Sequence, residues 1–155
     1  MAIVEQRLIE LGIELPKLNK PVANYVSVRR NGNLLYLSGT GPVIEGKVIY
    51  HGKLGIELTK EDGYKAARLS AMNMLGILKN ELGDLDKVEQ IINLQGFVAC
   101  SDEFYDQPFV INGASDLFVE VFGDAGKHTR AALGTNALPF NTPVEILMIV
   151  QIKEQ

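Results

Sequence analysis

Two long segments of this sequence carry apolar residues at helical spacing, and this repeat constrains the fold more than any other feature. The first segment begins at Thr59, where Asp62 three positions later predicts a capping box, and it ends before Gly83. The second begins at Asp106 and ends before Gly123. Their apolar stripes consist of Ala67, Ala71, Met74, Leu75 and Leu78 in the first, and Val110, Ile111, Ala114, Leu117, Phe118, Val121 and Phe122 in the second. We therefore predict two long core helices.

The apolar and β-branched segments before, between and after these helices predict a sheet. Asn31-Gly32 separates two such segments, and this dipeptide readily supplies the two positive φ angles of a tight hairpin. The segment 38–42, Ser-Gly-Thr-Gly-Pro, interrupts the second strand of that hairpin. The predicted strands are 25–30, 34–37, 46–50, 88–99, 131–137 and 144–153.

The order of the predicted elements indicates an α+β fold. Each long helix is followed by one or more strands, and this order is compatible with helices packed on one face of a mixed β-sheet. The other face of the sheet would be bare unless neighbouring subunits cover it, so we expect an oligomer. The chain of 155 residues, 46% hydrophobic and 22% charged, fits one globular domain over 1–155.

Residues 1–19 form a predicted helical extension ahead of this domain. Pro16 is expected to stop the helix, because proline cannot donate the next backbone hydrogen bond. The apolar repeat of the extension consists of Val4, Leu8, Leu11 and Leu15.

Charge and cysteine content narrow the classes of partner. The net charge is -4, and the 15 Lys and Arg residues are scattered, which argues against a nucleic-acid surface. No apolar run approaches the roughly 20 residues that span a bilayer. The single cysteine, Cys100, cannot form an internal disulfide, and the first residues include acids where a secretory leader would carry bases. We expect a cytoplasmic protein.

The histidines and the cysteine offer little chemistry. His51 and His128 have no partner at metal-ligand spacing, so no metal site is expected. His51 fits a solvated turn, whereas His128 lies two residues before Arg130 and would share its side of a strand. Cys100 lacks a nearby histidine or helix start that would lower its pKa, so we interpret it as a buried apolar residue.

Arg130 and Glu145 are the strongest candidates for chemistry that the residues alone provide. They lie on the two strands that flank the turn at 136–143, and Arg130 stands among apolar residues. A guanidinium there can hold the carboxylate of a ligand through two parallel hydrogen bonds. Equally, Arg130 and Glu145 can satisfy each other as a cross-strand ion pair without a ligand. The sequence leaves these two interpretations open.

The segment from His128 to Ile146, HTRAALGTNALPFNTPVEI, resembles the signature of the reactive intermediate deaminase (Rid, or YjgF) family. That signature combines an arginine, a Leu-Pro turn and Val-Glu-Ile, matched here by Arg130, 138–139 and 144–146. Upstream, Tyr25 precedes Ser38-Gly39 by the interval seen in the family. Asn112 matches an asparagine of the second core helix. The resemblance covers about residues 20 to 153.

This resemblance implies a chorismate-mutase-like homotrimer with ligand clefts between subunits and no cofactor. Arg130 would bind the carboxylate of a 2-imino or enamine acid, a small metabolite that is hydrolysed to a 2-keto acid and ammonia. The backbone of Gly39 would place the attacking water, Glu145 would move its proton, and Tyr25 would close the pocket. Asn112 and the backbone carbonyl of Ala132 would complete the substrate site.

Three departures from the family pattern leave the activity open. Ala132 stands where deaminating members carry a cysteine, Leu147 replaces a second glutamate, and Ser115 replaces an aromatic residue. A module that binds small carboxylate metabolites without catalysis is therefore the alternative to an imine deaminase. An endoribonuclease is a third function, and the acidic charge balance opposes it. The sequence does not identify the physiological substrate.

Overall fold

The computed structural model describes residues 3–17 and 23–154 of the chain. Its helices are α1 (Ile3–Glu10), α2 (Lys60–Leu82) and α3 (Gln107–Phe122), and short 3-10 turns cover Leu85–Lys87, Gly123–Gly126 and Pro139–Asn141. Its strands are β1 (Val28–Asn31), β2 (Leu34–Thr40), β3 (Val43–Ile44), β4 (Lys47–Val48), β5 (Val88–Ala99), β6 (Thr129–Thr135) and β7 (Val144–Ile152). None of these helices is both long enough and apolar enough to cross a membrane.

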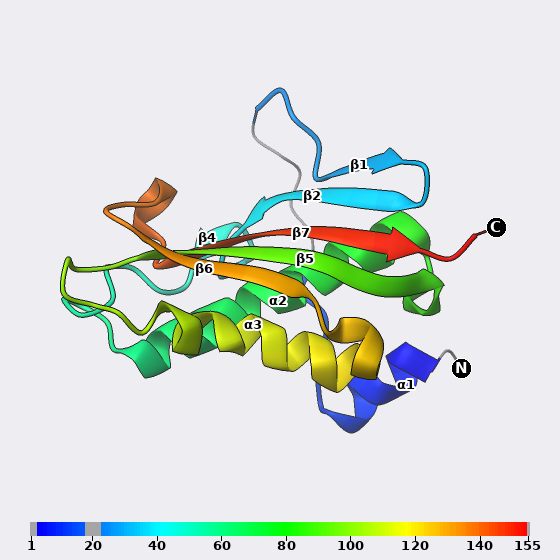
Figure 1. Cartoon of the computed structure of the whole chain (residues 1–155), viewed down its shortest axis with the longest axis horizontal. Helices are drawn as coiled ribbons and strands as arrows, with labels where there is room; N and C mark the ends of the chain where they lie inside the picture. The colour runs from blue at the N-terminus through cyan, green and yellow to red at the C-terminus, as the bar shows by residue number, and fades with distance from the viewer. Residues whose placement is uncertain (1–2, 18–22, 155) are drawn as a thin grey trace.

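A mixed sheet with α2 and α3 on one face forms the body of the molecule, as Figure 1 shows. The strand order is β1-β2-β7-β5-β6; β5 and β6 are parallel, and the other neighbours are antiparallel. Alternate residues of β7 point into the core beneath the helices because successive side chains of a strand face opposite sides. These core residues are Val144, Ile146, Met148, Val150 and Ile152. The predicted α+β fold is confirmed.

The ends of both long helices follow the predicted local rules. The Thr59 hydroxyl accepts from the backbone N–H of Asp62, and the Asp62 carboxylate accepts from the backbone N–H of Thr59. These two bonds form the capping box at the start of α2. Gly83 ends α2 with a positive φ of 77°, and Gly123 ends α3 at 63°. The two core helices were therefore correctly predicted.

The N-terminal helix is shorter than predicted because Gly12, not Pro16, ends it. Gly12 adopts φ +70°, its N–H donates to the Ile9 carbonyl, and the N–H of Ile13 donates to the Leu8 carbonyl. These paired bonds are a Schellman motif, which a glycine in the left-handed region completes. Residues 1–2 and 18–19 of the predicted extension lie outside the described residues.

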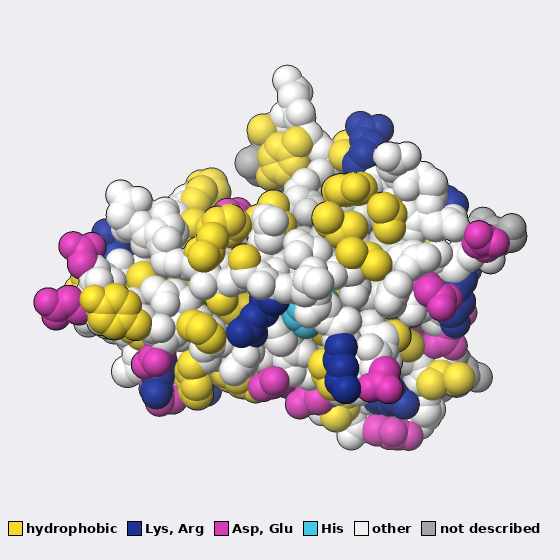
Figure 2. Space-filling model, in the orientation of Figure 1, with side chains coloured by type: hydrophobic (Ala, Val, Ile, Leu, Met, Phe, Trp, Pro, Cys, Tyr) yellow, Lys and Arg dark blue, Asp and Glu magenta, His cyan; other side chains and the backbone are white. Residues whose placement is uncertain are grey.

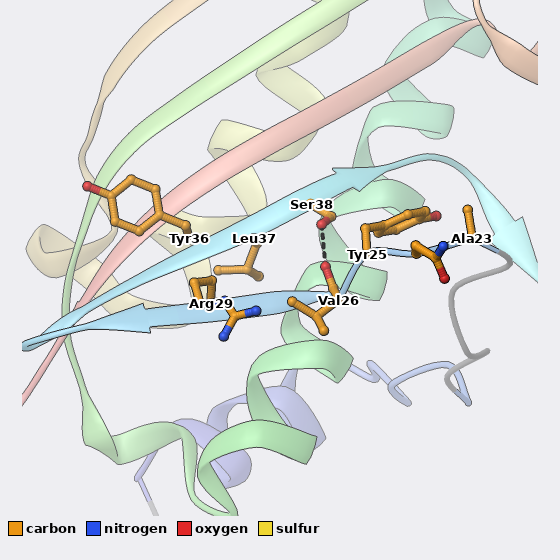
Figure 3. Close-up of a pocket in the computed structure, with 8 residues that line it drawn as sticks. Ala23, Tyr25, Val26, Arg29, Tyr36, Leu37 and Ser38 are labelled. Carbon is orange, nitrogen blue, oxygen red and sulfur yellow. Dashed lines mark hydrogen bonds between the residues drawn. The ribbon is translucent and has the colours of Figure 1, made fainter.

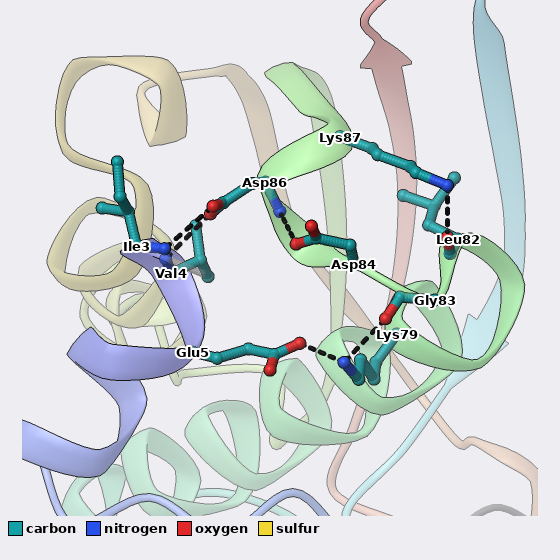
Figure 4. A network of polar contacts seen from close by, with 9 residues as sticks. All are labelled: Ile3, Val4, Glu5, Lys79, Leu82, Gly83, Asp84, Asp86 and Lys87. Atoms are coloured by element: carbon teal, nitrogen blue, oxygen red, sulfur yellow. Dashed lines mark hydrogen bonds and ion pairs between the residues drawn. The ribbon is translucent and has the colours of Figure 1, made fainter. Parts of the chain in front are cut away.

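The extension is fixed to the domain by polar contacts at its first turn, drawn in Figure 4. The Asp86 carboxylate accepts from the backbone N–H groups of Ile3 (2.8 Å) and Val4 (2.9 Å), and these bonds lower the pKa of Asp86. Glu5 forms an ion pair with Lys79 of α2. Val4 is also buried, so the helix is held by both capping and apolar packing.

Two details of the predicted strands are wrong. In the first hairpin Asn31 pairs with Leu34, so the turn is Gly32-Asn33 and, of the described residues, only Gly32 there has a positive φ. Among the described strands β4 of the segment 46–50 pairs with β3 alone, in a separate small hairpin and not in the main sheet. The Asn73 amide of α2 donates to the carbonyls of Gly41 and Val43, which draws this segment over the helix.

The sheet face opposite the helices carries apolar side chains that the described chain leaves partly uncovered. Tyr36 and Leu133 on this face are 44% and 52% exposed, and Phe97, Leu147 and Ile149 are half-buried. Figure 2 shows hydrophobic side chains gathered over the strands. An apolar sheet face of this kind is typical of an interface between subunits, so the oligomer stays a prediction.

Candidate functional site

Arg130 lies on the edge strand β6, directly beside the buried Leu94 of β5, and therefore on the helix side of the sheet. Its guanidinium Nη1 donates to Asn112 Oδ1 at 2.7 Å and to Ser115 Oγ at 3.2 Å, and both acceptors belong to α3. Within residues 3–17 and 23–154 Arg130 forms no ion pair. The guanidinium is thus oriented by the neutral groups of Asn112 and Ser115 and by no carboxylate of the described chain.

Ser115 and His128 complete the surroundings of this arginine. Ser115 Oγ lies 2.9 Å from His128 Nε2, and His128 Nδ1 lies 2.6 Å from the Gly126 carbonyl oxygen. Burial lowers the pKa of His128, and the nearby Arg130 charge adds to this, whereas the Gly126 bond opposes it. The imidazole is therefore neutral near pH 7. We call Arg130, Asn112, Ser115 and His128 the arginine half-site.

Glu145 occupies the opposite face of the sheet. It pairs with Phe97 of β5, and burial raises the pKa of its half-buried carboxyl group. A side chain at Gly39 would place its Cβ only 2.7 Å from Glu145 Oε1, so the carboxylate lies directly over the glycine backbone. The pairing of β2 with β7 shifts register between Leu37 and Thr40, which brings Gly39 to this position. Strand β2 continues to Thr40, so the predicted interruption at 38–42 is wrong for its first three residues, which form an irregularity within the strand.

Tyr25 and Ser38 lie beside an open pocket of about 690 Å³, shown in Figure 3. The Ser38 hydroxyl donates to the Val26 carbonyl at 2.6 Å, and the Ser38 N–H donates to the Ser27 carbonyl at 2.9 Å. These bonds hold the segment before β1, including the half-exposed Tyr25, against the end of β2. Tyr25, Ser38, Gly39 and Glu145 constitute the glutamate half-site.

Within one chain the two half-sites are separate. Strand β5 lies between β6 and β7, and Arg130 and Glu145 point to opposite faces of the sheet. The interpretation of these two residues as a cross-strand ion pair is therefore wrong. The structure brings Arg130 together with Asn112, and Glu145 together with Gly39, but it does not join the two pairs in a single subunit.

Ala132 follows Arg130 on the same face of β6 and is half-buried against the core. Among the described strands, β6 pairs only with β5, so its other edge presents backbone groups without a strand partner. A substrate contact through the Ala132 backbone remains a prediction. Cys100 is buried, as expected, and His51 lies exposed in its turn. No three His, Cys, Asp or Glu side chains gather as metal ligands in the described part of the chain.

Ser115 is the site residue that sequence reasoning missed. It was noted only as a replacement for an aromatic residue, although it lies three positions after Asn112 on the same helix. Residues three apart share a helix face, so both side chains reach Arg130. The two-residue spacing of His128 and Arg130 correctly indicated one side, since both contact the Ser115 hydroxyl.

Comparisons with known proteins agree with this fold. Residues 5–152 match the family described as "YjgF/chorismate_mutase-like, putative endoribonuclease". Protein TCP17 of Trypanosoma cruzi is 40% identical over 150 residues, which cover 96% of this chain and 94% of that protein.

Two crystal structures have closely similar folds. Atu1372 of Agrobacterium tumefaciens, a protein of unknown function, is 46% identical with a TM-score of 0.91 over 97% of this chain and 93% of its own. A "putative endoribonuclease" of Shewanella oneidensis MR-1 is 34% identical with a TM-score of 0.93 over 96% and 99% of the two chains. The chain therefore belongs to the YjgF (Rid) family and has its chorismate-mutase-like fold.

Proposed function

We propose that this protein is a homotrimer that hydrolyses 2-imino or enamine acids to 2-keto acids and ammonium in clefts between its subunits. The observation that carries this proposal is the state of Arg130, whose guanidinium is oriented by Asn112 and Ser115 without a carboxylate partner in the described chain. A guanidinium held in this way can bind a substrate carboxylate through two parallel hydrogen bonds.

The two half-sites supply complementary parts of the reaction. One subunit would contribute Arg130 to hold the carboxylate, and its neighbour would contribute Glu145 and Gly39 to the same cleft. The uncovered apolar sheet face, which includes Tyr36 and Leu133, supports this assembly because subunit contact would bury it. This arrangement explains why the chain keeps Arg130 and Glu145 on opposite faces of its own sheet.

Hydrolysis of an imine requires the protein to orient the substrate and the attacking water and to transfer protons between them. Water adds to the electrophilic iminium carbon, the carbon–nitrogen bond breaks, and the nitrogen leaves as ammonium while a keto group forms. Glu145 accepts a proton from the water and returns it to the departing nitrogen. A carboxyl group whose pKa is raised by burial is a better proton acceptor at neutral pH than an ordinary glutamate.

Binding without catalysis is the second candidate, and the side chains around the half-sites favour it. Ala132 offers only a methyl group where deaminating members of the family carry a thiol. Leu147 is the next residue after Glu145 on the same face of β7, and it offers no second carboxylate. A sensor that captures a keto acid through Arg130 fits these residues as well.

The test uses an imine generated in solution from a small amino acid and follows formation of the 2-keto acid. Arg130→Ala removes the fork and should abolish the enzymatic acceleration, and Arg130→Lys keeps the charge but not the paired geometry. Arg30→Ala is the matched control, because this exposed arginine donates a hydrogen bond to the Gly32 carbonyl of the hairpin and belongs to neither half-site. Full activity of Arg130→Ala would refute the proposal. Calorimetric binding of pyruvate without turnover would select the binding module.

Mixing two inactive variants tests whether the cleft is shared. In a trimer refolded from equal amounts of Arg130→Ala and Glu145→Gln subunits, a site works only where an intact arginine meets an intact glutamate. Random assembly gives this combination in about one quarter of the sites of a cyclic oligomer. Recovery of about that fraction of wild-type turnover is expected. Absence of any recovery would show that the two residues do not act in one intersubunit site.

A further inference from the structure

A chain of four hydrogen-bonded groups leads from the backbone to the Arg130 guanidinium. The Gly126 carbonyl can only accept, so the hydrogen of His128 is on Nδ1. Nε2 of this neutral ring is then an acceptor, and the Ser115 hydroxyl donates to it. Ser115 Oγ therefore presents lone pairs to Arg130 Nη1. Each donor among these four groups has one matching acceptor, which fixes the direction of all three hydrogen bonds.

The imidazole of His128 is itself fixed in place. It is half-buried, and its ring packs against that of Phe118 in α3 in a T-shaped contact, with ring centroids 6.2 Å apart and an interplanar angle of 86°. An aromatic edge contact of this kind holds the plane of the ring as well as its position. The acceptor for the Ser115 hydroxyl thus has a defined direction in space.

As a result, one nitrogen of the Arg130 guanidinium has no hydrogen left to donate to a ligand. Nη1 carries two hydrogens, and its two acceptors are Asn112 Oδ1 and Ser115 Oγ. Within the described residues Nε and Nη2 have no hydrogen-bond partner. A carboxylate that binds through two parallel bonds must therefore use the edge formed by Nε and Nη2.

We infer that Ser115 and His128 are positioning residues that orient the Arg130 guanidinium so that its Nε and Nη2 edge receives the ligand carboxylate. This inference rests on the proposed function, since it assumes that Arg130 binds a carboxylate. It assigns a role to two residues that neither touch the reacting atoms nor belong to the main sheet. With Asn112 as its single partner, the guanidinium could rotate about that one hydrogen bond. The second hydrogen bond, to Ser115, prevents this rotation.

The experiment measures binding of pyruvate, as the probe, by calorimetry at pH 7.5. Ser115→Ala should weaken binding about fivefold, the effect of losing one typical hydrogen bond, and Ser115→Thr, which keeps a hydroxyl, should bind within about twofold of wild type. Ser70→Ala is the matched control, because the Ser70 hydroxyl donates to the Ala66 carbonyl within α2 and lies outside the arginine half-site. In turnover assays Ser115→Ala should raise KM with little change in kcat, as expected for loss of an anchor used equally by substrate and transition state.

A second readout does not depend on any ligand. Nitrogen-15 spectra of the histidine ring should show the hydrogen of His128 on Nδ1 in the wild type and a changed Nε2 resonance in Ser115→Ala. A hydrogen found on Nε2, or pyruvate binding that Ser115→Ala leaves unchanged, would overturn the inference alone. If wild type and Arg130→Ala both fail to bind pyruvate while the ring signature is as expected, the proposed function fails, and the positioning role falls with it.

Discussion

Gly113 sets the distance between α2 and α3, and its replacement by alanine gives a sharp test of the structure. An added Cβ would lie 2.0 Å from the Tyr64 carbonyl oxygen and 3.1 Å from the Arg68 nitrogen, both in the backbone of α2. Because real Cβ contacts do not fall below 3.0 Å, the helices must separate by about 1 Å. Backbone atoms cannot turn aside as a side-chain end can.

The expected cost follows from what this separation loosens. Burial of the apolar side chains around Gly113 contributes about 6 kcal/mol to stability. A gap of about 1 Å weakens the van der Waals contacts of these side chains by about a third, which costs roughly 2 kcal/mol. Overpacking strain adds roughly 2 kcal/mol, and the better helix propensity of alanine returns about 1 kcal/mol. The net loss is about 3 kcal/mol, which for a chain of this length lowers Tm by roughly 6–12 °C.

Gly63→Ala is the matched control, since it makes the same change in the partner helix. The three atoms nearest its added Cβ would be side-chain ends, Leu54 Cδ1 at 2.7 Å and the two Val110 methyl groups at 3.0 Å, which can shift. We expect this variant to stay within about 1 kcal/mol of wild type. Denaturant unfolding at one fixed protein concentration compares the three proteins. Wild-type stability of Gly113→Ala, or equal losses in both variants, would refute the reasoning.

Three further predictions address the half-sites and the extension. Glu145→Gln should lower turnover about 10²- to 10⁴-fold. Because the pKa of Glu145 is raised in the folded protein, wild type should lose stability relative to this variant as pH rises from 4 to 8. A stability difference in denaturant unfolding that does not change with pH would contradict this. The folded pKa of His128 is depressed, so wild type should lose stability relative to His128→Asn as pH falls through about 6.5. His51→Asn, which replaces the exposed histidine of the 50–52 turn, is the matched control. Asp86→Ala removes the cap of α1, so hydrogen exchange there should accelerate about fivefold while α2 is unaffected; unchanged exchange in α1 would disprove the capping role.

Local sequence rules predicted most of the elements and some of their ends. The capping pair Thr59 and Asp62 and the glycine after each long helix are short-range signals, because their hydrogen bonds join residues three or four apart. The same rules failed where two signals competed. Gly12 ends the first helix before Pro16 is reached, and Gly32, not Asn31, begins the hairpin turn.

The sequence identified candidate site residues but not their arrangement, and their roles stay predictions. Arg130, Asn112, Glu145 and Gly39 were all identified, and the structure pairs the first two and the last two. The contribution of Ser115 was missed, because a single serine in a helix carries no chemical signal until its neighbours in space are known.

The amino-acid sequence by itself determined which segments become helices and strands, since periodicity and capping act over a few residues. Only the tertiary structure decided that β5 lies between β6 and β7, because strand order depends on pairings between residues far apart in the chain. That order keeps Arg130 and Glu145 two strands apart, and the pairing registers direct Arg130 toward α3 and Glu145 toward the uncovered face. The separation of the arginine and glutamate half-sites is therefore a property of long-range pairing, which no local pattern encodes.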